Sequence, residues 1–392
     1  MFQIPFNKPY MTGKEVEYIS QAVELGHLSG NGPFTRKCQQ WLEYSIGCQK
    51  ALLTHSGTAA LEMAALLLDL KPGDEVIMPS FTFVSTANAF VLRGTVPVFV
   101  DIRPDTMNID ENQLEKAITE KTKAIVIVHY AGVGCEMDQI MEIAGKYHIP
   151  LIEDAAHCVQ AYYKGRELGS FGQLAILSFH ETKNIIAGEG GALLINDASL
   201  AERAEIIWEK GTNRSQFFRG EVDKYTWVDI GSSFLPNEQS AAFLWAQMEM
   251  ADIITAKRLN IWHQYHRAFQ PLEEKGLLLR PEIPPECQHN AHMYHLRLNA
   301  LEARTAFIES LKAFGIHTVF HYIPLHSSPA GQKYGRPGSS LIQTESISEC
   351  LVRLPLWFTL SNEEISYIID HVFRFFDVAR NTTECVGSLQ LQ

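Results

Sequence analysis

The chain has 392 residues, of which 46% are hydrophobic and 20% are charged, and its formal net charge is −12. A chain of this length exceeds what one hydrophobic core usually supports, so we expect two domains. The acidic balance argues against a nucleic-acid partner, because phosphate backbones are bound by basic surfaces.

Cysteine usage and the amino-terminal segment bear on the cellular location. The seven cysteines are odd in number and form no Cys-x-x-Cys pair, which favours reduced thiols over a disulfide framework or a zinc site. Residues 1–8 lack a basic start followed by an apolar core, and no uncharged apolar run approaches the ~20 residues that span a bilayer. We therefore expect a cytoplasmic protein with no membrane partner.

From about residue 50 to residue 200, short apolar runs alternate with helical patterns. Residues 124–128 are apolar at every position, as expected for a strand that helices cover on both faces. Alternating strands and helices predict a mostly parallel sheet, in which ligands gather at the carboxyl ends of the strands. The predicted strands are 75–79, 96–101, 124–129, 150–153, 174–179 and 192–196, and the predicted helices are 58–68, 85–93, 111–119 and 137–147.

The second half of the chain predicts helices and then a smaller α+β unit. Residues 199–270 are predicted to be mainly helical, with a polar loop at 211–225 and a long helix at 236–270 that leaves the first domain. Three prolines between residues 281 and 285 mark a linker. Strands are predicted at 292–298 and 317–322, and helices at 303–314 and 362–377. We expect a large domain at 1–250, a small domain at 251–380 and a disordered tail at 381–392.

Two polar residues follow neighbouring predicted strands. Lys183 lies in the loop after the strand at 174–179, and Asp154 comes directly after the strand at 150–153. Most loop lysines are solvated charges, and a lysine bonds to a carbonyl carbon only when its amine is partly deprotonated. Pyridoxal phosphate requires such a lysine for its aldehyde and a buried aspartate that keeps its pyridine nitrogen protonated. We therefore predict Lys183 and Asp154 as catalytic residues with this cofactor.

A helix start supplies a third contact. Ser56, Gly57 and Thr58 open the predicted helix, whose free N–H groups and positive dipole end favour a phosphate. Plain capping by Ser56 is the better interpretation of this segment alone. Lys183 and Asp154 shift the balance toward a cofactor phosphate, to which Ser178 adds a hydroxyl.

Several aromatic residues and histidines allow two interpretations. Phe83 is predicted to lie against the pyridine ring, although core packing is the commoner role of phenylalanine. His157 either bonds near the ring oxygen of the cofactor or starts a helix. His289, His292 and His295 recur at every third residue, but this spacing on a strand puts neighbours on opposite faces, so we predict no metal site.

A basic loop stands out in this acidic chain. It contains Lys210, Arg214, Arg219 and Lys224. A solvated loop is the default interpretation, and the functional alternative is a clamp for an anionic substrate, to which arginine is well suited.

With these segments placed, the chain resembles the DegT/DnrJ/EryC1 family of sugar aminotransferases, from about residue 4 to residue 376. The segments that carry the likeness are 56–61, 79–83, 153–157, 178–184 and 188–191. The resemblance implies a homodimeric pyridoxal-phosphate enzyme of fold type I, with a mostly parallel large domain and a smaller α+β carboxyl-terminal domain. It also implies that Lys183 bonds to the cofactor, Asp154 contacts its ring nitrogen, Gly57, Thr58 and Ser178 hold its phosphate, Phe83 packs on its ring and His157 lies beside it. Many members carry a phosphate-binding asparagine, supplied by the partner subunit, in the segment that matches 231–233, where this chain has Ser233.

A closer likeness within the family implies a reaction. Segments 79–93, 103–110, 209–225 and 320–325 are similar to members that aminate C4 of a dTDP-linked keto-sugar for lipopolysaccharide or enterobacterial common antigen. This implies that L-glutamate aminates dTDP-4-dehydro-6-deoxy-D-glucose to give dTDP-4-amino-4,6-dideoxy-D-galactose. Tyr322 and His326 are then candidate sugar contacts. The gluco epimer and amination at C3 remain alternatives.

Two other classes of protein share features with this sequence. A nicotinamide dehydrogenase would need Gly-x-Gly-x-x-Gly after its first strand, and Gly132-Val133-Gly134 lacks the third glycine. A non-catalytic sensor with this fold would need an output module, and the sequence contains no basic DNA-reading segment. We therefore favour the aminotransferase.

Overall fold

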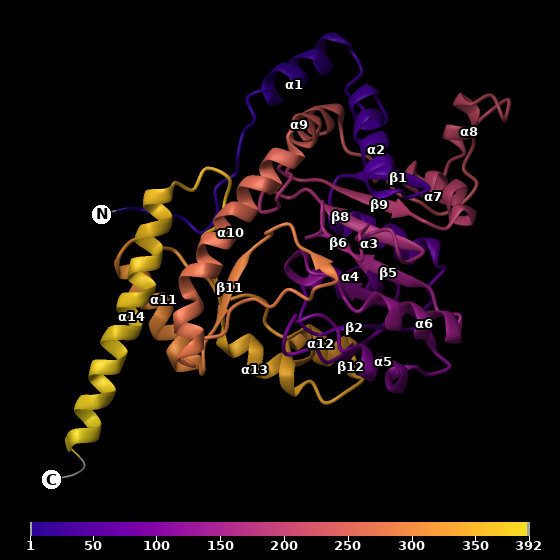
Figure 1. The fold of residues 1–392 in the computed structure, drawn as a ribbon. Coiled ribbons are helices and arrows are strands. Elements are labelled where there is room, and N and C mark those ends of the chain that lie inside the picture. The colour runs from indigo at the N-terminus through magenta and orange to yellow at the C-terminus, as the bar shows by residue number, and fades with distance from the viewer. Residues whose placement is uncertain (1, 390–392) are drawn as a thin grey trace.

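The centre of the protein is an eight-stranded sheet, seen in a computed structural model that describes residues 2–389, with side chains described for 2–377 (Figure 1). The strands, in sheet order, are β1 Lys50–Thr54, β9 Gly191–Ile195, β8 Leu174–Ser178, β5 Leu151–Asp154, β4 Thr122–Val128, β2 Glu75–Pro79, β3 Val96–Val100 and β12 Arg336–Pro337. Neighbours are parallel except at β9, which is antiparallel to both β1 and β8. The predicted mostly parallel sheet is confirmed.

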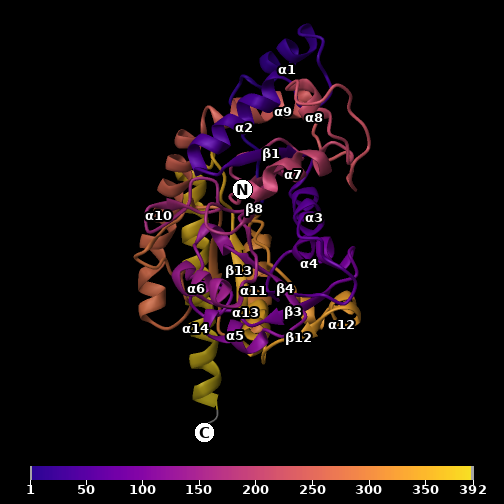
Figure 2. The ribbon, with the colours of Figure 1, turned by 90° about the vertical axis from the view of Figure 1, so that its right-hand side faces the viewer.

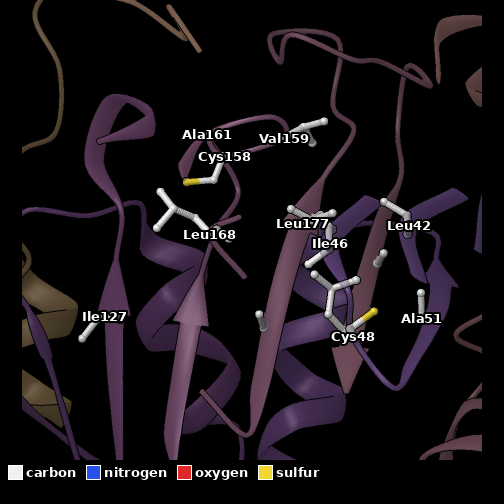
Figure 3. Close-up of a cluster of buried hydrophobic side chains, with 14 of the residues drawn as sticks. Leu42, Ile46, Cys48, Ala51, Ile127, Cys158, Val159, Ala161, Leu168 and Leu177 are labelled. Atoms are coloured by element: carbon white, nitrogen blue, oxygen red, sulfur yellow. The ribbon is translucent and has the colours of Figure 1, made fainter. Parts of the chain in front are cut away.

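Helices cover both faces of this sheet. The first face packs against α2 Pro33–Ile46, α5 Glu111–Ala117, α6 Met137–Tyr147 and α9 Glu238–Met248. The second face packs against α3 Gly57–Leu67, α4 Val84–Val91 and α7 Ala201–Trp208. Figure 2 shows α3 and α4 on one side of the sheet and α6 on the other. Because Ile125 and Ile127 of β4 face one layer while Val126 faces the other, that strand is apolar throughout. Figure 3 shows part of the first core, including Ile46 of α2 and Leu177 of β8.

A separate core belongs to the smaller unit. The long helix α10, Ala251–Glu274, contributes Ile254 to the first core and Ile261, Tyr265 and Phe269 to the smaller one. The other elements here are the antiparallel pair β11 Tyr294–Arg297 and β13 Leu351–Leu354, with α11 Leu301–Ala313, α13 Ile342–Cys350 and α14 Asn362–Leu389. The predicted domain boundaries stay a prediction, although this second core is consistent with two units.

The remaining elements lie at the edges of the molecule. They are α1 Glu15–Glu24, α8 Arg214–Phe218, α12 Pro329–Tyr334, the short strands β6 Tyr162–Tyr163, β7 Arg166–Glu167 and β10 Cys287–Gln288, and the 3-10 turns Tyr130–Gly132, Ala198–Leu200 and Leu325–Ser327. Figure 1 shows α8 standing off the body beside α7. None of the helices in the described part of the chain is long and apolar enough to cross a membrane.

Three predicted elements differ from those observed. The long helix predicted at 236–270 is two helices, α9 and α10, with a break at 249–250. The strand predicted at 317–322 is one isolated bridge, between Val319 and Arg353, because the segment turns away to line a cavity. The backbone of α14 continues to Leu389, because no proline follows Asn362, and so it enters the segment predicted as a tail; residues 390–392 lie outside the described part.

Candidate active site

A cavity of about 820 Å³ lies at the carboxyl ends of the sheet strands. Its walls come from the sheet, from the amino-terminal residues Phe6 and Asn7, and from segments 319–322 and 353–356 of the smaller unit. Eight of the predicted site residues line it: Gly57, Thr58, Phe83, Asp154, His157, Ser178, Lys183 and Tyr322. The cavity therefore brings together the two residues predicted to be catalytic and most of the predicted cofactor contacts.

Lys183 lies in the loop between β8 and β9. The loop folds back on itself, since Lys183 N donates to His180 O at 2.9 Å and Ala187 N donates to Phe179 O at 2.7 Å. Burial lowers the pKa of the Lys183 ammonium to about 8, an effect that the negative charge of Asp154 opposes. The unprotonated amine is therefore accessible near neutral pH, as bonding to an aldehyde requires.

Asp154 ends β5 and is almost fully buried. Its carboxylate accepts hydrogen bonds from Thr86 Oγ1 at 2.8 Å and from Ala156 N at 3.2 Å. Burial raises the pKa of this carboxyl, although both hydrogen bonds act in the opposite direction. A protonated ring nitrogen beside the carboxylate would offset this burial cost. Asp154 thus suits the ring-nitrogen contact predicted for it.

The start of α3 forms a cradle for an anion. Ser56 Oγ caps the helix by accepting from Ala59 N at 3.1 Å, and the first-turn N–H groups at Gly57 and Thr58 have no intrahelical acceptor. Gly191 of β9 touches the backbone here, because a Cβ at that position would lie 2.4 Å from Gly57 N. Ser178 ends β8 opposite Gly191 in the antiparallel pair. Free N–H groups, the helix dipole and a serine hydroxyl meet at one point, which suits a phosphate.

His157 is a buried, neutral histidine. Its Nδ1 accepts from Ala131 N at 3.3 Å, so in the neutral ring the proton is on Nε2, which lies 3.4 Å from Tyr322 Oη. Burial lowers the pKa of His157, and its ring stacks on that of His292 with centroids 4.1 Å apart. The histidine borders the cavity, and its predicted contact with the cofactor stays a prediction.

Two phenylalanines in segment 79–83 have different environments. Phe81 is 1% exposed and belongs to a core cluster, whereas Phe83 is 57% exposed, precedes α4 and lines the cavity. The ring centroid of Phe83 lies 6.4 Å from that of Tyr322. An exposed ring at the cavity wall is available to stack on a planar ligand, so this position is consistent with the prediction.

The remaining predicted residues do not line this cavity within one chain. They are Ser233, Lys210, Arg214, Arg219 and His326. Arg219 pairs with Glu205 at 2.8 Å and with Glu221 at 2.7 Å, as in a structured surface loop. His326 Nε2 lies 3.1 Å from Glu345 Oε1. One chain by itself does not bring these five residues to the cavity, and their roles stay predictions.

The cavity contains residues that sequence reasoning missed. Thr86 donates a hydrogen bond to Asp154 and lies one helical turn after Phe83. Because residues one turn apart share a helix face, its spacing from a predicted cofactor residue could have identified it. Arg353 interrupts the apolar run of β13, and a charge in such a run was a second signal. His321 offered none, because the segment around it was predicted as a strand.

These groups fit pyridoxal phosphate. The cavity contains an anion cradle, a buried carboxylate, an amine with a lowered pKa and an exposed aromatic ring, which together match the phosphate, the ring nitrogen, the aldehyde and the ring face of that cofactor. Among the described side chains, no group of three or more His, Cys, Asp or Glu residues is arranged to hold a metal ion.

Comparison with known proteins agrees with this geometry. The model of the DegT/DnrJ/EryC1/StrS aminotransferase family matches residues 9–373. The chain is 35% identical over 378 residues to uncharacterized protein MJ1066 of Methanocaldococcus jannaschii, covering 95% of this chain and 97% of the relative. It is 32% identical over 377 residues to the spore coat polysaccharide biosynthesis protein SpsC of Bacillus subtilis, covering 94% and 96%.

Solved structures give the cofactor. The PLP form of Spr1654 from Streptococcus pneumoniae has a TM-score of 0.87 at 27% identity, covering 97% of this chain and 99% of that one, and a PMP form has also been solved. The predicted cofactor and the predicted fold type I are confirmed by these matches. The chain belongs to the DegT/DnrJ/EryC1/StrS family of sugar aminotransferases, which depend on pyridoxal phosphate.

Proposed function

We propose that this enzyme transfers the amino group of L-glutamate to the C4 ketone of dTDP-4-dehydro-6-deoxy-D-glucose and yields dTDP-4-amino-4,6-dideoxy-D-galactose. The observation that carries the amino transfer is the Lys183 amine, with its lowered pKa, in one cavity with the buried carboxylate of Asp154. The choice of donor and of sugar nucleotide rests on the closer sequence likeness at 79–93, 103–110, 209–225 and 320–325.

The residues of this chain have distinct tasks in that reaction. Pyridoxal phosphate, when bound, supplies an aldehyde that takes up the amino group and a ring that withdraws electrons from the donor. The N–H groups of Gly57 and Thr58 and the hydroxyl of Ser178 would bind its phosphate. Asp154 would keep the ring nitrogen of the cofactor protonated. Thr86 holds the Asp154 carboxylate in place by a hydrogen bond.

Lys183 moves the proton. Its free amine removes a proton from the α-carbon of the donor, and the resulting ammonium returns it at the carbon that carried the aldehyde. In the second half of the cycle the same nitrogen delivers a proton to the sugar carbon that gains the amine. Holding the reacting groups in one cavity is worth up to about 7–11 kcal/mol when their geometry is right.

The cavity also suits a large substrate. Ligand pockets typically measure about 300–1,000 Å³, and this cavity of about 820 Å³ has room beside the cofactor position for a sugar. Tyr322 lies beside Phe83 and His157, and it is the sugar contact that we propose from the sequence and that also lines the cavity.

Two measurements with purified protein test the proposal. The enzyme should be yellow, and adding L-glutamate should bleach that colour, because the aldehyde is consumed. Incubation with the keto-sugar nucleotide should then restore the colour, and NMR of the product should show an axial amine at C4. An equatorial amine would assign the gluco product instead, and a colour that glutamate does not change would reject glutamate as the donor.

A further inference from the structure

Arg353 of β13 brings a positive charge to the wall of the cavity. Its guanidinium lies over the ring of Phe6, 4.7 Å from the centroid, and Nη2 donates to Phe320 O at 3.2 Å. Its Nε is buried without a hydrogen-bond partner, and among the side chains described no carboxylate lies within ion-pair distance. A largely buried guanidinium without an anion is costly, so this arrangement indicates a ligand that carries one.

His321 presents a neutral N–H group in the same wall. Tyr130 is 1% exposed, and burial raises the pKa of its phenol, so the phenol keeps its proton. Its Oη lies 2.7 Å from His321 Nδ1, so the phenol donates and Nδ1 accepts. Burial, and then the charge of Arg353, lower the pKa of His321, which leaves a neutral ring with its proton on Nε2. Arg353 bonds to the carbonyl of Phe320, the residue that precedes His321, and both side chains line the same cavity.

We propose that Arg353 and the Nε2–H of His321 bind the α-carboxylate of the amino donor. This inference rests on the proposed aminotransferase function and adds the residues that recognise the donor. The α-carboxylate is attached to the carbon that Lys183 deprotonates, so it has to lie near that amine, and Arg353 is close enough for its charge to act on Lys183. The diphosphate of the sugar nucleotide is attached at C1, across the sugar ring from the reacting C4, and so it lies farther from Lys183.

The other charged groups on the cavity wall do not compete for this role. Arg258 directs its Nε and Nη2 to the carbonyls of Ala291 and His292, at 3.1 and 2.8 Å. Glu189 is exposed, 3.7 Å from His180 Nε2, and Asp154 is bonded to Thr86. Within the part of the chain whose side chains are described, Arg353 is thus the wall arginine that bonds to one backbone carbonyl only and to no carboxylate.

The test compares two donors on three proteins. L-Isoglutamine keeps the γ-carboxylate of glutamate but carries a neutral amide in place of the α-carboxylate. We expect Arg353→Gln to lower kcat/KM for glutamate by roughly 10- to 150-fold, the range for loss of a charged hydrogen bond, and to change the value for isoglutamine by less than about threefold. Arg304→Gln is the matched control, because among the described residues its Nε is also buried without a partner and its guanidinium also lies over a phenylalanine ring, that of Phe320 at 5.5 Å, but it does not line the cavity. It should behave as the unchanged protein.

Two further readouts separate the possible failures. Calorimetric affinity for glutarate, which has both carboxylates but no amine to react, should fall by a similar factor in Arg353→Gln and less in Arg353→Lys, which keeps the charge but not the planar fork. Amination of the keto-sugar nucleotide by protein loaded with pyridoxamine phosphate should be unchanged by Arg353→Gln. If that half-reaction slows while glutarate affinity stays the same, Arg353 serves the sugar nucleotide and the inference is wrong. If the unchanged protein aminates no keto-sugar but binds glutarate through Arg353, the proposed acceptor is wrong and the anion site stands.

Discussion

At the residue scale, the surroundings of Lys183 set its chemistry. Burial acts first on its ammonium, Asp154 and Cys158 stabilise the charge, and Arg353 destabilises it. With a pKa near 8, well below the usual value for lysine, the amine gains its free form as the pH rises through 8. This order of effects gives a pH dependence that the cofactor-free protein should show by itself.

We expect the rate at which cofactor-free protein takes up pyridoxal phosphate to increase with pH, to be half-maximal near pH 8 and to level off about one pH unit higher. An unperturbed lysine would still be gaining reactivity near pH 10. The absorbance of the bound cofactor, followed by stopped flow between pH 6 and 10, measures this rate. A continuous rise to pH 10 would contradict the lowered pKa.

Replacing Lys183 by alanine should reduce amino transfer by at least about 10³-fold, because the protein loses the amine that moves the proton. The thermal unfolding midpoint should change little, since the side chain makes no hydrogen bond that holds the fold together. Lys164→Ala, at an exposed turn between β6 and β7, is the control and should retain full activity. Substantial turnover by Lys183→Ala would count against the mechanism.

How much of the site could be predicted depends on where each residue lies. Lys183, Asp154 and Gly57 were predictable because each follows a strand or opens a helix at one edge of a parallel sheet. Arg353 and His321 were not predicted, because only tertiary packing brings their segments to that edge. The hydrogen bonds of the His326 ring to Ser80 and Glu345 could not be predicted, because no sequence pattern reveals them, and its role as a sugar contact stays a prediction.

At the element scale, the junction of β9 with α3 depends on one glycine. A Cβ at Gly191 would lie 2.4 Å from Gly57 N and 2.5 Å from the carbonyl carbon of Ser56, and backbone atoms cannot move aside cheaply. The strand and the helix start are therefore fixed at a separation that only glycine allows. This separation positions the anion cradle.

Gly191→Ala should weaken the affinity for pyridoxal phosphate by at least about tenfold, because the strand must shift away from the cradle. Equilibrium dialysis with the cofactor measures the change. Gly145→Ala in α6 is the matched control, since a Cβ there meets nothing within 4 Å, and it should leave the affinity unchanged and stabilise the helix by about 0.5–1 kcal/mol. Equal affinities for the two variants would refute the role given to Gly191.

Helix α2 is capped from another helix. Gly32 precedes it and has no side chain to offer, and the fully buried carboxylate of Glu238 in α9 accepts from Gly32 N at 3.0 Å, Phe34 N at 2.8 Å and Thr35 N at 3.0 Å. The cap thus also joins two helices on one face of the sheet.

Glu238→Ala should lower the free energy of unfolding by about 2–5 kcal/mol, because several buried N–H groups lose their acceptor. Urea denaturation followed by circular dichroism measures this. Glu238→Gln, which keeps one acceptor oxygen, should cost less. If both variants are as stable as the original chain, the cap is not important for stability.

A strand or helix could be predicted from the sequence where a single hydrophobic pattern determines its structure. Residues 124–128 are apolar on both sides and form β4 as expected, because helices cover both faces. The segment 236–270 has a continuous helical pattern, and the break between α9 and α10 was not visible in it. Residues 317–322 have the composition of a strand but lie along the cavity, so their side chains face ligand space instead of a sheet neighbour.

At the scale of the whole molecule, the segment from Lys210 to Ser233 lies outside the cavity of its own chain. It contains exposed aromatic side chains, among them Trp227 at 79% and Phe218 at 66% exposure. Exposed apolar groups of this kind are typical of contact surfaces. We therefore predict that the segment packs against a second copy and that its basic residues serve the partner's cavity.

The protein should then sediment at twice its 44.2 kDa chain mass. Mixed dimers provide a second check. A Lys183→Ala chain and a Lys210→Ala/Arg214→Ala chain should each be poorly active alone, but a co-expressed mixture should regain activity, because one of its two sites is intact. A monomeric protein, or a mixture no better than its components, would contradict the prediction.

The first described residues have a consequence for how the protein is handled. Ile4 is fully buried and is held by Gly315 O and His317 N, at 2.8 and 2.9 Å, and Phe6 and Asn7, two and three residues later, line the cavity. An affinity handle fused ahead of residue 4 would therefore begin within a few residues of the cavity wall. Figure 1 shows α14 leading the opposite end of the described chain away from the body. Purification and surface immobilisation are therefore best done through that end.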